Sequence, residues 1–134
     1  MCLTINKVFN TKEEALAYPA SIATEDIKVY KVLIGKKILG IPFGNMAPYR
    51  DFHYTRRKKY RAKFGRTTSY TFPWTNDDRF SLDIDEGLHA YVEKKDAMKL
   101  KEKETIVVQM TIPKGSEYYL GTRGDIVSNC LIYK

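Results

Sequence analysis

Cysteine is scarce in this chain of 134 residues, which has only Cys2 and Cys130. Neither belongs to a CxxC pair or a Cys/His cluster, so the sequence predicts neither a disulfide framework nor a zinc site. The five carboxylates of TNDDRFSLDIDEG (75–87) do not have the spacing of an EF-hand loop. We therefore expect no metal ion and no cofactor.

Long apolar runs are also missing. No stretch approaches the 18 residues of a transmembrane helix, and the N-terminus has no apolar run of signal-peptide length. These absences predict a protein of the reducing cytoplasm that has no membrane partner.

Common catalytic motifs are absent too. The sequence contains no GxSxG, no P-loop and no GxGxxG, and neither Ser116 nor Ser128 has an evident base partner. We leave open whether the protein is an enzyme, but the sequence favours a protein without catalytic activity.

Aromatic and β-branched residues are abundant by comparison. Hydrophobic residues make up 43% of the chain, and ten tyrosines and six phenylalanines stand against five prolines. This composition supports a real core built mainly of strands, and the length is typical of one domain. We predict a single α+β domain over residues 1–134, with a curved, mostly antiparallel sheet of about six to eight strands and two short helices.

Hydrophobic periodicity and turn residues place the elements. Helices are expected over 10–18, where Thr11 and Glu14 have the spacing of a capping box, and over 93–103. Turns or loops are expected at 35–37, 42–48 and 75–87. Strands are expected over 27–34, 38–41, 67–74, 87–92, 105–113, 117–121 and 126–133.

The segment from 49 to 72 is harder to interpret. We predict a hairpin in which FHYT (52–55), a basic turn and YRAKFG (60–65) follow one another. A helix through 56–63 is the competing interpretation, although only Tyr60 and Phe64 have helical spacing there.

The net charge of +7 is concentrated in one short segment. Residues 50 to 66 contain eight basic residues and one acidic residue, whereas the rest of the chain contains fifteen of each. A charge so localised raises the electrostatic potential over one patch and favours anionic partners.

Within this segment, cations alternate with aromatic rings. The cations would bind the phosphates of a nucleic acid or nucleotide, and the rings of Tyr54 and Tyr60 would stack on bases. The alternative is a solvated or partner-binding face of a strand pair, where lysine also discourages edge pairing. The carboxylates of 75–87 could instead pair with these cations within the molecule. The expected phosphate-binding residues are Arg56, Arg57, Lys58, Lys59, Arg61 and Lys63.

A second candidate site is His89-x-Tyr91, whose two side chains share one face of the strand over 87–92. A histidine and a tyrosine so placed can hold a ribose or nicotinamide, or transfer protons. The alternative is a core histidine that is hydrogen-bonded to the backbone.

Four segments resemble a group of small uncharacterised proteins from bacteriophages and gut Bacteroidetes. They are DIKVYKVL (26–33), APYRDFHYTRRKKY (47–60), GLHAYVEKKDA (87–97) and TIPKGSEYYLGTRGDIVSNCLIY (111–133). The resemblance implies a viral or mobile-element origin, and therefore the cytoplasm of a host cell. The group usually has glycine and fewer charges where this chain has RRKK (56–59), so the basic patch is a departure from it.

The segment TIPKGSEYYLG (111–121) is also similar to a late segment of ADP-ribosyltransferases. In those enzymes the closing strand carries a catalytic glutamate, but the corresponding strand here has Asn129. Without that carboxylate, an oxocarbenium-like transition state lacks its stabiliser, so the resemblance implies nucleotide binding more than transfer.

Three functions follow as hypotheses. The first is a non-enzymatic phage or mobile-element accessory protein that binds nucleic acid or a nucleotide through the basic segment. The second is a divergent ADP-ribosyltransferase-like protein that binds NAD with His89, Tyr91 and Glu117. The third is an inhibitor of a host defence factor, acting on a host protein or by sequestering a nucleotide signal. No oligomeric state is predicted.

Overall fold

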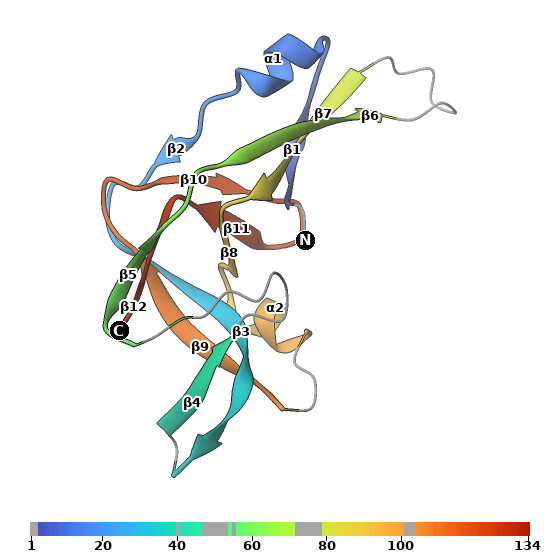
Figure 1. The fold of residues 1–134 in the computed structure, drawn as a ribbon. Helices are drawn as coiled ribbons and strands as arrows, with labels where there is room; N and C mark the ends of the chain where they lie inside the picture. Colours follow the sequence, from blue (N-terminus) through green and yellow to red (C-terminus); the bar gives the residue numbers. More distant parts are fainter. Residues whose placement is uncertain (1–2, 40, 47–53, 55, 72–78, 101–103) are drawn as a thin grey trace.

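The computed structural model describes residues 3–39, 41–46, 54, 56–71, 79–100 and 104–134. In these residues two antiparallel sheets contain twelve strands, and two five-residue helices contact the sheets (Figure 1). The mostly antiparallel sheet and the two short helices agree with the predicted α+β class. The described residues contain twelve strands, which is more than the six to eight that we predicted.

The larger sheet forms the body of the molecule. Its central pair is β3 (Ile27–Ile38) and β9 (Thr105–Ile112), which run antiparallel with Ile27 opposite Ile112 and Ile34 opposite Thr105. The strand order across the sheet is β2 (Ser21–Ile22), β10 (Glu117–Leu120), β11 (Asp125–Ser128), β8 (Leu88–Tyr91), β3, β9, β12 (Cys130–Tyr133) and β5 (Lys58–Arg61).

The smaller sheet has β7 (Arg79–Glu86) between β1 (Leu3–Phe9) and β6 (Gly65–Thr71). The loop predicted over 75–87 is therefore wrong for residues 79–86. Leu82 and Ile84 are fully buried on one face of β7 and alternate with the carboxylates of Asp83 and Asp85. A period of two with acids on the other face is the pattern of a half-buried strand.

The region after residue 34 also differs from the prediction. β3 continues through the expected turn at 35–37 and ends at Ile38, which pairs with Ile41 at the start of β4 (Ile41–Met46). The chain therefore reverses direction between Ile38 and Ile41. Most of the loop predicted at 42–48 is strand, because residues 42–46 pair with β3.

Both helices are close to their predicted positions. In α1 (Lys12–Leu16) the Thr11 hydroxyl accepts a 3.1 Å hydrogen bond from the Glu14 amide, as expected of an N-cap. The second helix, α2 (Lys94–Met98), is shorter than the predicted span of 93–103. It docks through Ala97, which is fully buried against Val32 and Val107.

The core connects the two sheets. Leu3 and Leu82 of the smaller sheet pack in one cluster with Tyr119 and Val127 of the larger sheet. A second cluster covers the inner face of β3 and β9. The chain from β5 into β6 crosses from the larger sheet to the smaller one (Figure 1), so the segment that carries the basic residues is tied to both sheets.

Parts of several predictions fall outside the described residues. These are most of FHYT and of the segment before it, the end of the strand over 67–74, the start of the loop over 75–87, and residues 101–103 of the predicted second helix.

Candidate functional site

The basic segment forms the last strand of the larger sheet. β5 pairs on one side with β12, with Lys58 opposite Tyr133 and Arg61 opposite Cys130. No described strand pairs with its other side. The helix considered for 56–63 is therefore wrong, because residues 58–61 form a strand beside β12. The predicted hairpin partner, FHYT, lies mostly outside the described residues, so that pairing stays a prediction.

Strand geometry separates the cations of β5 from its ring. Lys59 and Arg61 lie on one face of the sheet, and Tyr60, opposite Leu131, lies on the other and packs against the main core cluster. Successive side chains of a strand point to opposite faces, so this alternation follows directly from the sequence KYR.

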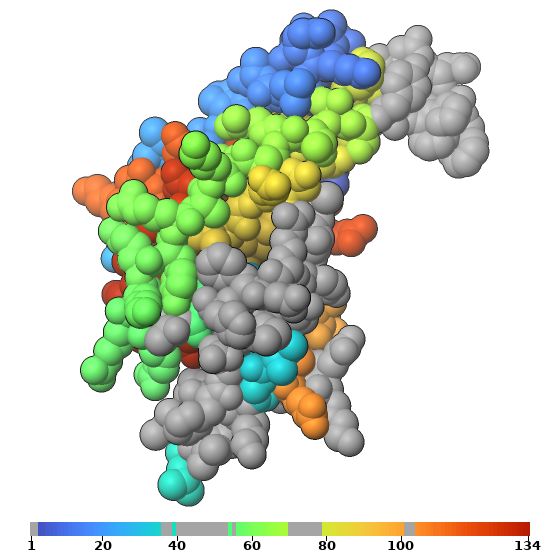
Figure 2. All heavy atoms as spheres, in the orientation of Figure 1, coloured from blue at the N-terminus to red at the C-terminus, as the bar shows by residue number. Residues whose placement is uncertain are grey.

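We call six residues the basic surface: Arg56, Arg57, Lys58, Lys59, Arg61 and Lys63. All six are exposed, and Figure 2 shows the segment that carries them on the surface of the molecule. Within the described residues, none of them forms an ion pair.

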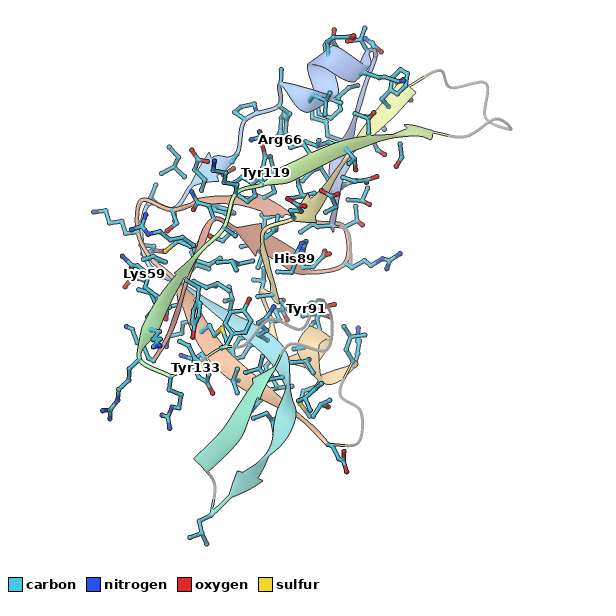
Figure 3. The ribbon with its side chains drawn as sticks, in the orientation of Figure 1. Lys59, Arg66, His89, Tyr91, Tyr119 and Tyr133 are labelled. Carbon is cyan, nitrogen blue, oxygen red and sulfur yellow. The ribbon has the colours of Figure 1, made fainter. Side chains whose placement is uncertain are left out.

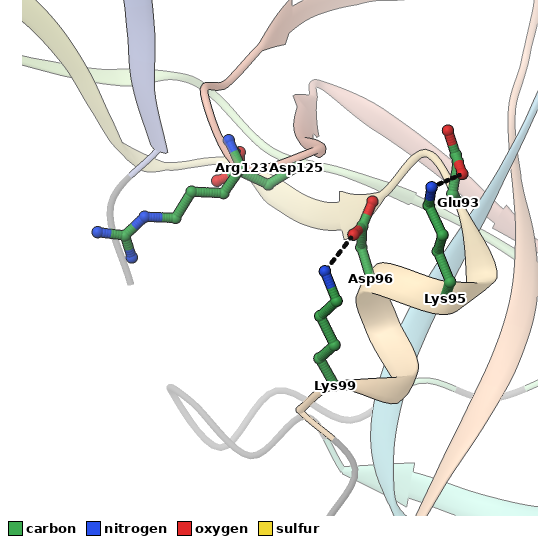
Figure 4. A network of polar contacts seen from close by, with 6 residues as sticks. All are labelled: Glu93, Lys95, Asp96, Lys99, Arg123 and Asp125. Carbon is green, nitrogen blue, oxygen red and sulfur yellow. Dashed lines mark hydrogen bonds and ion pairs between the residues drawn. The ribbon is translucent and has the colours of Figure 1, made fainter.

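Among the described residues, ion pairs are found around α2 instead. They join Lys95 to Glu93 at 3.1 Å and Lys99 to Asp96 at 3.4 Å (Figure 4). The contrast matters because a cation paired with a carboxylate must lose that partner before it binds a phosphate. With respect to the carboxylates of the described residues, the basic surface has no such cost.

Of the two rings predicted to stack on bases, one is buried and the other is half-buried. Tyr54 is 2% exposed and its ring packs edge-on against that of Tyr60, with 4.9 Å between centroids. The prediction that Tyr54 stacks on a base is corrected accordingly: its ring lies in the core, and Tyr60 is half-buried beside it. Burial, with the nearby Tyr60 hydroxyl as a second cause, raises the pKa of Tyr54.

The turn before β5 is held against the end of β12. Arg57 has φ of 63°, in the left-handed region, and its amide donates a hydrogen bond to the Tyr133 carbonyl. The Tyr133 hydroxyl is buried and has no hydrogen-bond partner among the described residues. Burial raises its pKa, and the positive charge of Arg56 opposes that effect. Arg56 therefore lies close enough to act on this hydroxyl.

The site reasoning from sequence missed Lys31, whose side chain enters the core between Val29 and Leu33 on the inner face of β3. Its Nζ donates a hydrogen bond to the His89 carbonyl and lies 5.1 Å from the centre of the Tyr54 ring. Protein atoms surround the ammonium, although the side chain keeps partial contact with solvent. Desolvation lowers its pKa from 10.5 to about 8. The sequence did contain a signal for this burial, because Val29, Lys31 and Leu33 alternate along the strand and so share one face.

His89 and Tyr91 share a face of β8, as predicted, while Leu88 and Ala90 point into the main core cluster. They are not part of the basic surface, because β3, β9 and β12 lie between β8 and β5. Four inter-strand steps correspond to about 19 Å. Figure 3 shows this separation between His89 and Lys59.

His89 and Glu117 are also not brought together. Val127 lies opposite His89 and also opposite Tyr119 on the next strand, and both Val127 and Tyr119 are buried core residues. The buried side chains of Val127 and Tyr119 therefore stand on the face of the sheet that His89 shares. The arrangement gives the NAD-binding hypothesis no assembled site.

Two other polar groups of the sequence have structural partners. The guanidinium of Arg66 donates to the Tyr119 hydroxyl at 3.0 and 3.2 Å, and that hydroxyl donates to the Tyr18 carbonyl at 2.7 Å (Figure 3). Asp83 accepts hydrogen bonds from Thr4 and Ser69 across the smaller sheet. Asp83 is therefore engaged within the smaller sheet, whereas Arg66 is an exposed cation that its hydrogen bonds hold against Tyr119.

The described residues contain no group of three or more histidines, cysteines or carboxylates that could hold a metal ion. None of the helices in the described part of the chain is long and apolar enough to cross a membrane.

Comparisons with known proteins found no match among family models, curated proteins or solved structures. The resemblance to the phage and Bacteroidetes group stays a prediction.

Proposed function

We propose that this protein binds nucleic acid by its phosphate backbone, through the basic surface. The observation that carries the proposal is the set of six exposed cations on an edge strand and its flanks, none of them paired with a described carboxylate. The proposal also covers the origin suggested by the sequence, a phage or mobile-element accessory protein acting in a host cytoplasm.

Electrostatics supports an extended polyanion as the ligand. Unpaired cations gathered on one surface sum to a positive potential that attracts phosphates at long range. Each phosphate that a cation neutralises releases condensed counterions, which makes binding favourable at low salt. Lys59 and Arg61 are two residues apart on one face of β5, about 7 Å along the strand, so they can contact neighbouring phosphates together.

The buried rings favour recognition of the backbone over recognition of bases. Proteins that grip single strands by stacking present aromatic faces to the ligand. Here Tyr54 lies in the core and Tyr60 is half-buried against it. We therefore expect weak dependence on nucleotide sequence.

The test is a fluorescence-anisotropy titration of labelled single-stranded and duplex oligonucleotides over a series of salt concentrations. The test variant is Lys59→Glu/Arg61→Glu, which reverses two exposed charges without touching the turn that carries Arg57. The matched control is Lys94→Glu/Arg123→Glu, which has the same net charge but changes exposed residues away from β5.

We expect the wild type and the control to bind at low salt, with affinity that falls as salt rises, and the test variant to lose binding. Equal affinity for the two variants would show that overall charge, and not the basic surface, attracts the ligand. Absence of wild-type binding at low salt would refute the proposal. Pull-down from nuclease-treated host lysate would then test a protein partner.

A further inference from the structure

The hairpin of β3 and β4 extends beyond the body of the molecule. The pairing of β3 with β9 ends at Ile34 opposite Thr105, and from Lys36 to Ile38 β3 pairs with β4. Figure 1 shows this two-stranded arm projecting from the end of the larger sheet at which β5 begins. The arm and the turn of Arg56 and Arg57 therefore belong to the same end of the molecule.

The tip of the arm is energetically unfavourable in two ways. Leu39 is 97% exposed, so its side chain gains almost nothing from burial. Its φ is 52°, in the left-handed region that disfavours a residue with a branched aliphatic side chain. Leu39 lies between Ile38 and Ile41, which are paired, and the common turns of such hairpins, types I′ and II′, both have positive φ at the first central position. Asparagine, aspartate and glycine are the residues preferred at positive φ. Packing within the molecule explains neither cost.

The charge of the arm and the apolar side chain at its tip indicate the chemical class of the partner. No acidic residue occurs from Ile27 to Arg50, and Lys36 and Lys37 precede the tip. A cationic ribbon with an apolar tip suits a partner whose surface is anionic and whose interior is apolar. Duplex DNA has this combination, because phosphates flank a stack of bases.

We propose that Leu39 is an apolar wedge that enters a base step of duplex DNA while the basic surface holds the flanking phosphates. The inference rests on the proposed function and goes beyond it by specifying a double-stranded ligand that is bent on binding. Apolar side chains inserted between base pairs unstack them and kink the duplex. Proteins that contact DNA with β-ribbons place them in the major or the minor groove, and apolar wedges enter from the minor groove.

The test measures bending by energy transfer between dyes at the two ends of a short DNA duplex. The main variant is Leu39→Asn, which removes the apolar side chain and creates Asn-Gly, the sequence that type I′ turns prefer. The arm should then be at least as well formed as in the wild type. The matched control is Leu39→Met, which keeps a large apolar side chain at the tip.

We expect the wild type and Leu39→Met to raise the energy transfer on binding. Leu39→Asn should bind with an unchanged salt dependence and lose that rise. Bending by Leu39→Asn equal to that of the wild type would overturn the wedge, as would wild-type binding without bending, and both results would leave the proposed function standing.

If the wild type binds no duplex, the wedge and the binding of duplex DNA fall together. A parallel titration with anionic-lipid vesicles tests whether the tip binds a lipid surface instead of DNA. Vesicle binding that depends on Leu39, with no bending of DNA, would assign the tip to a lipid surface and refute the inference.

Discussion

The buried ammonium of Lys31 makes the stability of the protein depend on pH. The folded state lowers the pKa of this group from 10.5 to about 8 because burial desolvates the charge. Below pH 8 the lysine is charged in both the folded and unfolded states, and the folded state bears the cost of burying it. Between pH 8 and 10.5 the folded state loses the proton that the unfolded state retains, so the free energy of unfolding rises with pH.

The size of the effect follows from the difference between the two pKa values. A difference of about 2.5 at about 1.4 kcal/mol per unit corresponds to about 3 kcal/mol over the whole transition. Most of this, about 2.5 kcal/mol, falls between pH 7 and pH 10. Since Lys31 keeps partial contact with solvent, these values are upper limits.

The assay is urea denaturation of the wild type and Lys31→Met at intervals from pH 7 to pH 10. Methionine fills similar space without a charge, so the variant should be more stable at pH 7, and its advantage should shrink as the pH rises. Comparing the two curves cancels the titration of the tyrosines, which the proteins share. Lys28→Met, which replaces an exposed lysine on the same strand, is the control and should run parallel to the wild type. If the stability of Lys31→Met and of the wild type changed with pH in parallel, the lowered pKa of Lys31 would be refuted.

Three further predictions concern individual hydroxyl groups, a helix cap and the cations of β5. Tyr119→Phe removes a hydroxyl with the two partners described above and should lower the free energy of unfolding by about 1–3 kcal/mol. Tyr133→Phe removes a buried hydroxyl that has no hydrogen-bond partner among the described residues, and it should leave the free energy of unfolding unchanged or raise it. Denaturant titration measures the free energy of unfolding of both variants. An equal decrease for Tyr119→Phe and Tyr133→Phe would contradict this prediction. Thr11→Ala removes the N-cap of α1 and should cost about 1 kcal/mol, with Thr11→Ser close to the wild type in the same assay. If Lys59 and Arg61 each neutralise one phosphate, replacing both with glutamine should reduce the slope of log affinity against log salt by about 1.4 for a single strand and about 1.8 for a duplex. An unchanged slope would remove these two residues from the interface.

Local patterns predicted a useful part of the fold. The capping box at Thr11, the buried strand over 105–113 and the common face of His89 and Tyr91 are each recognisable within a few neighbouring residues. The strand at 79–86 was not predicted, because its acidic residues are typical of a loop. The alternation of Leu82 and Ile84 with these acids is the pattern that indicates a strand. The reversal between Ile38 and Ile41 was not predicted, because leucine is a poor residue for the positive φ that Leu39 adopts.

The sequence by itself determined where the charge lies and which side chains share a face. The excess of cations in residues 50–66 is a property of composition, and the period of a strand separates Lys59 and Arg61 from Tyr60 wherever the strand is placed.

Only the tertiary structure decided which face is covered and which strands are neighbours. β5 pairs with β12, some 70 residues along the chain, and this pairing places the Tyr60 ring against the core and leaves Lys59 exposed. It also placed three strands between β5 and His89, which divides one predicted set of ligand residues into two distant groups. Pairing between remote strands depends on how the whole core fills, and a short stretch of sequence does not contain that information.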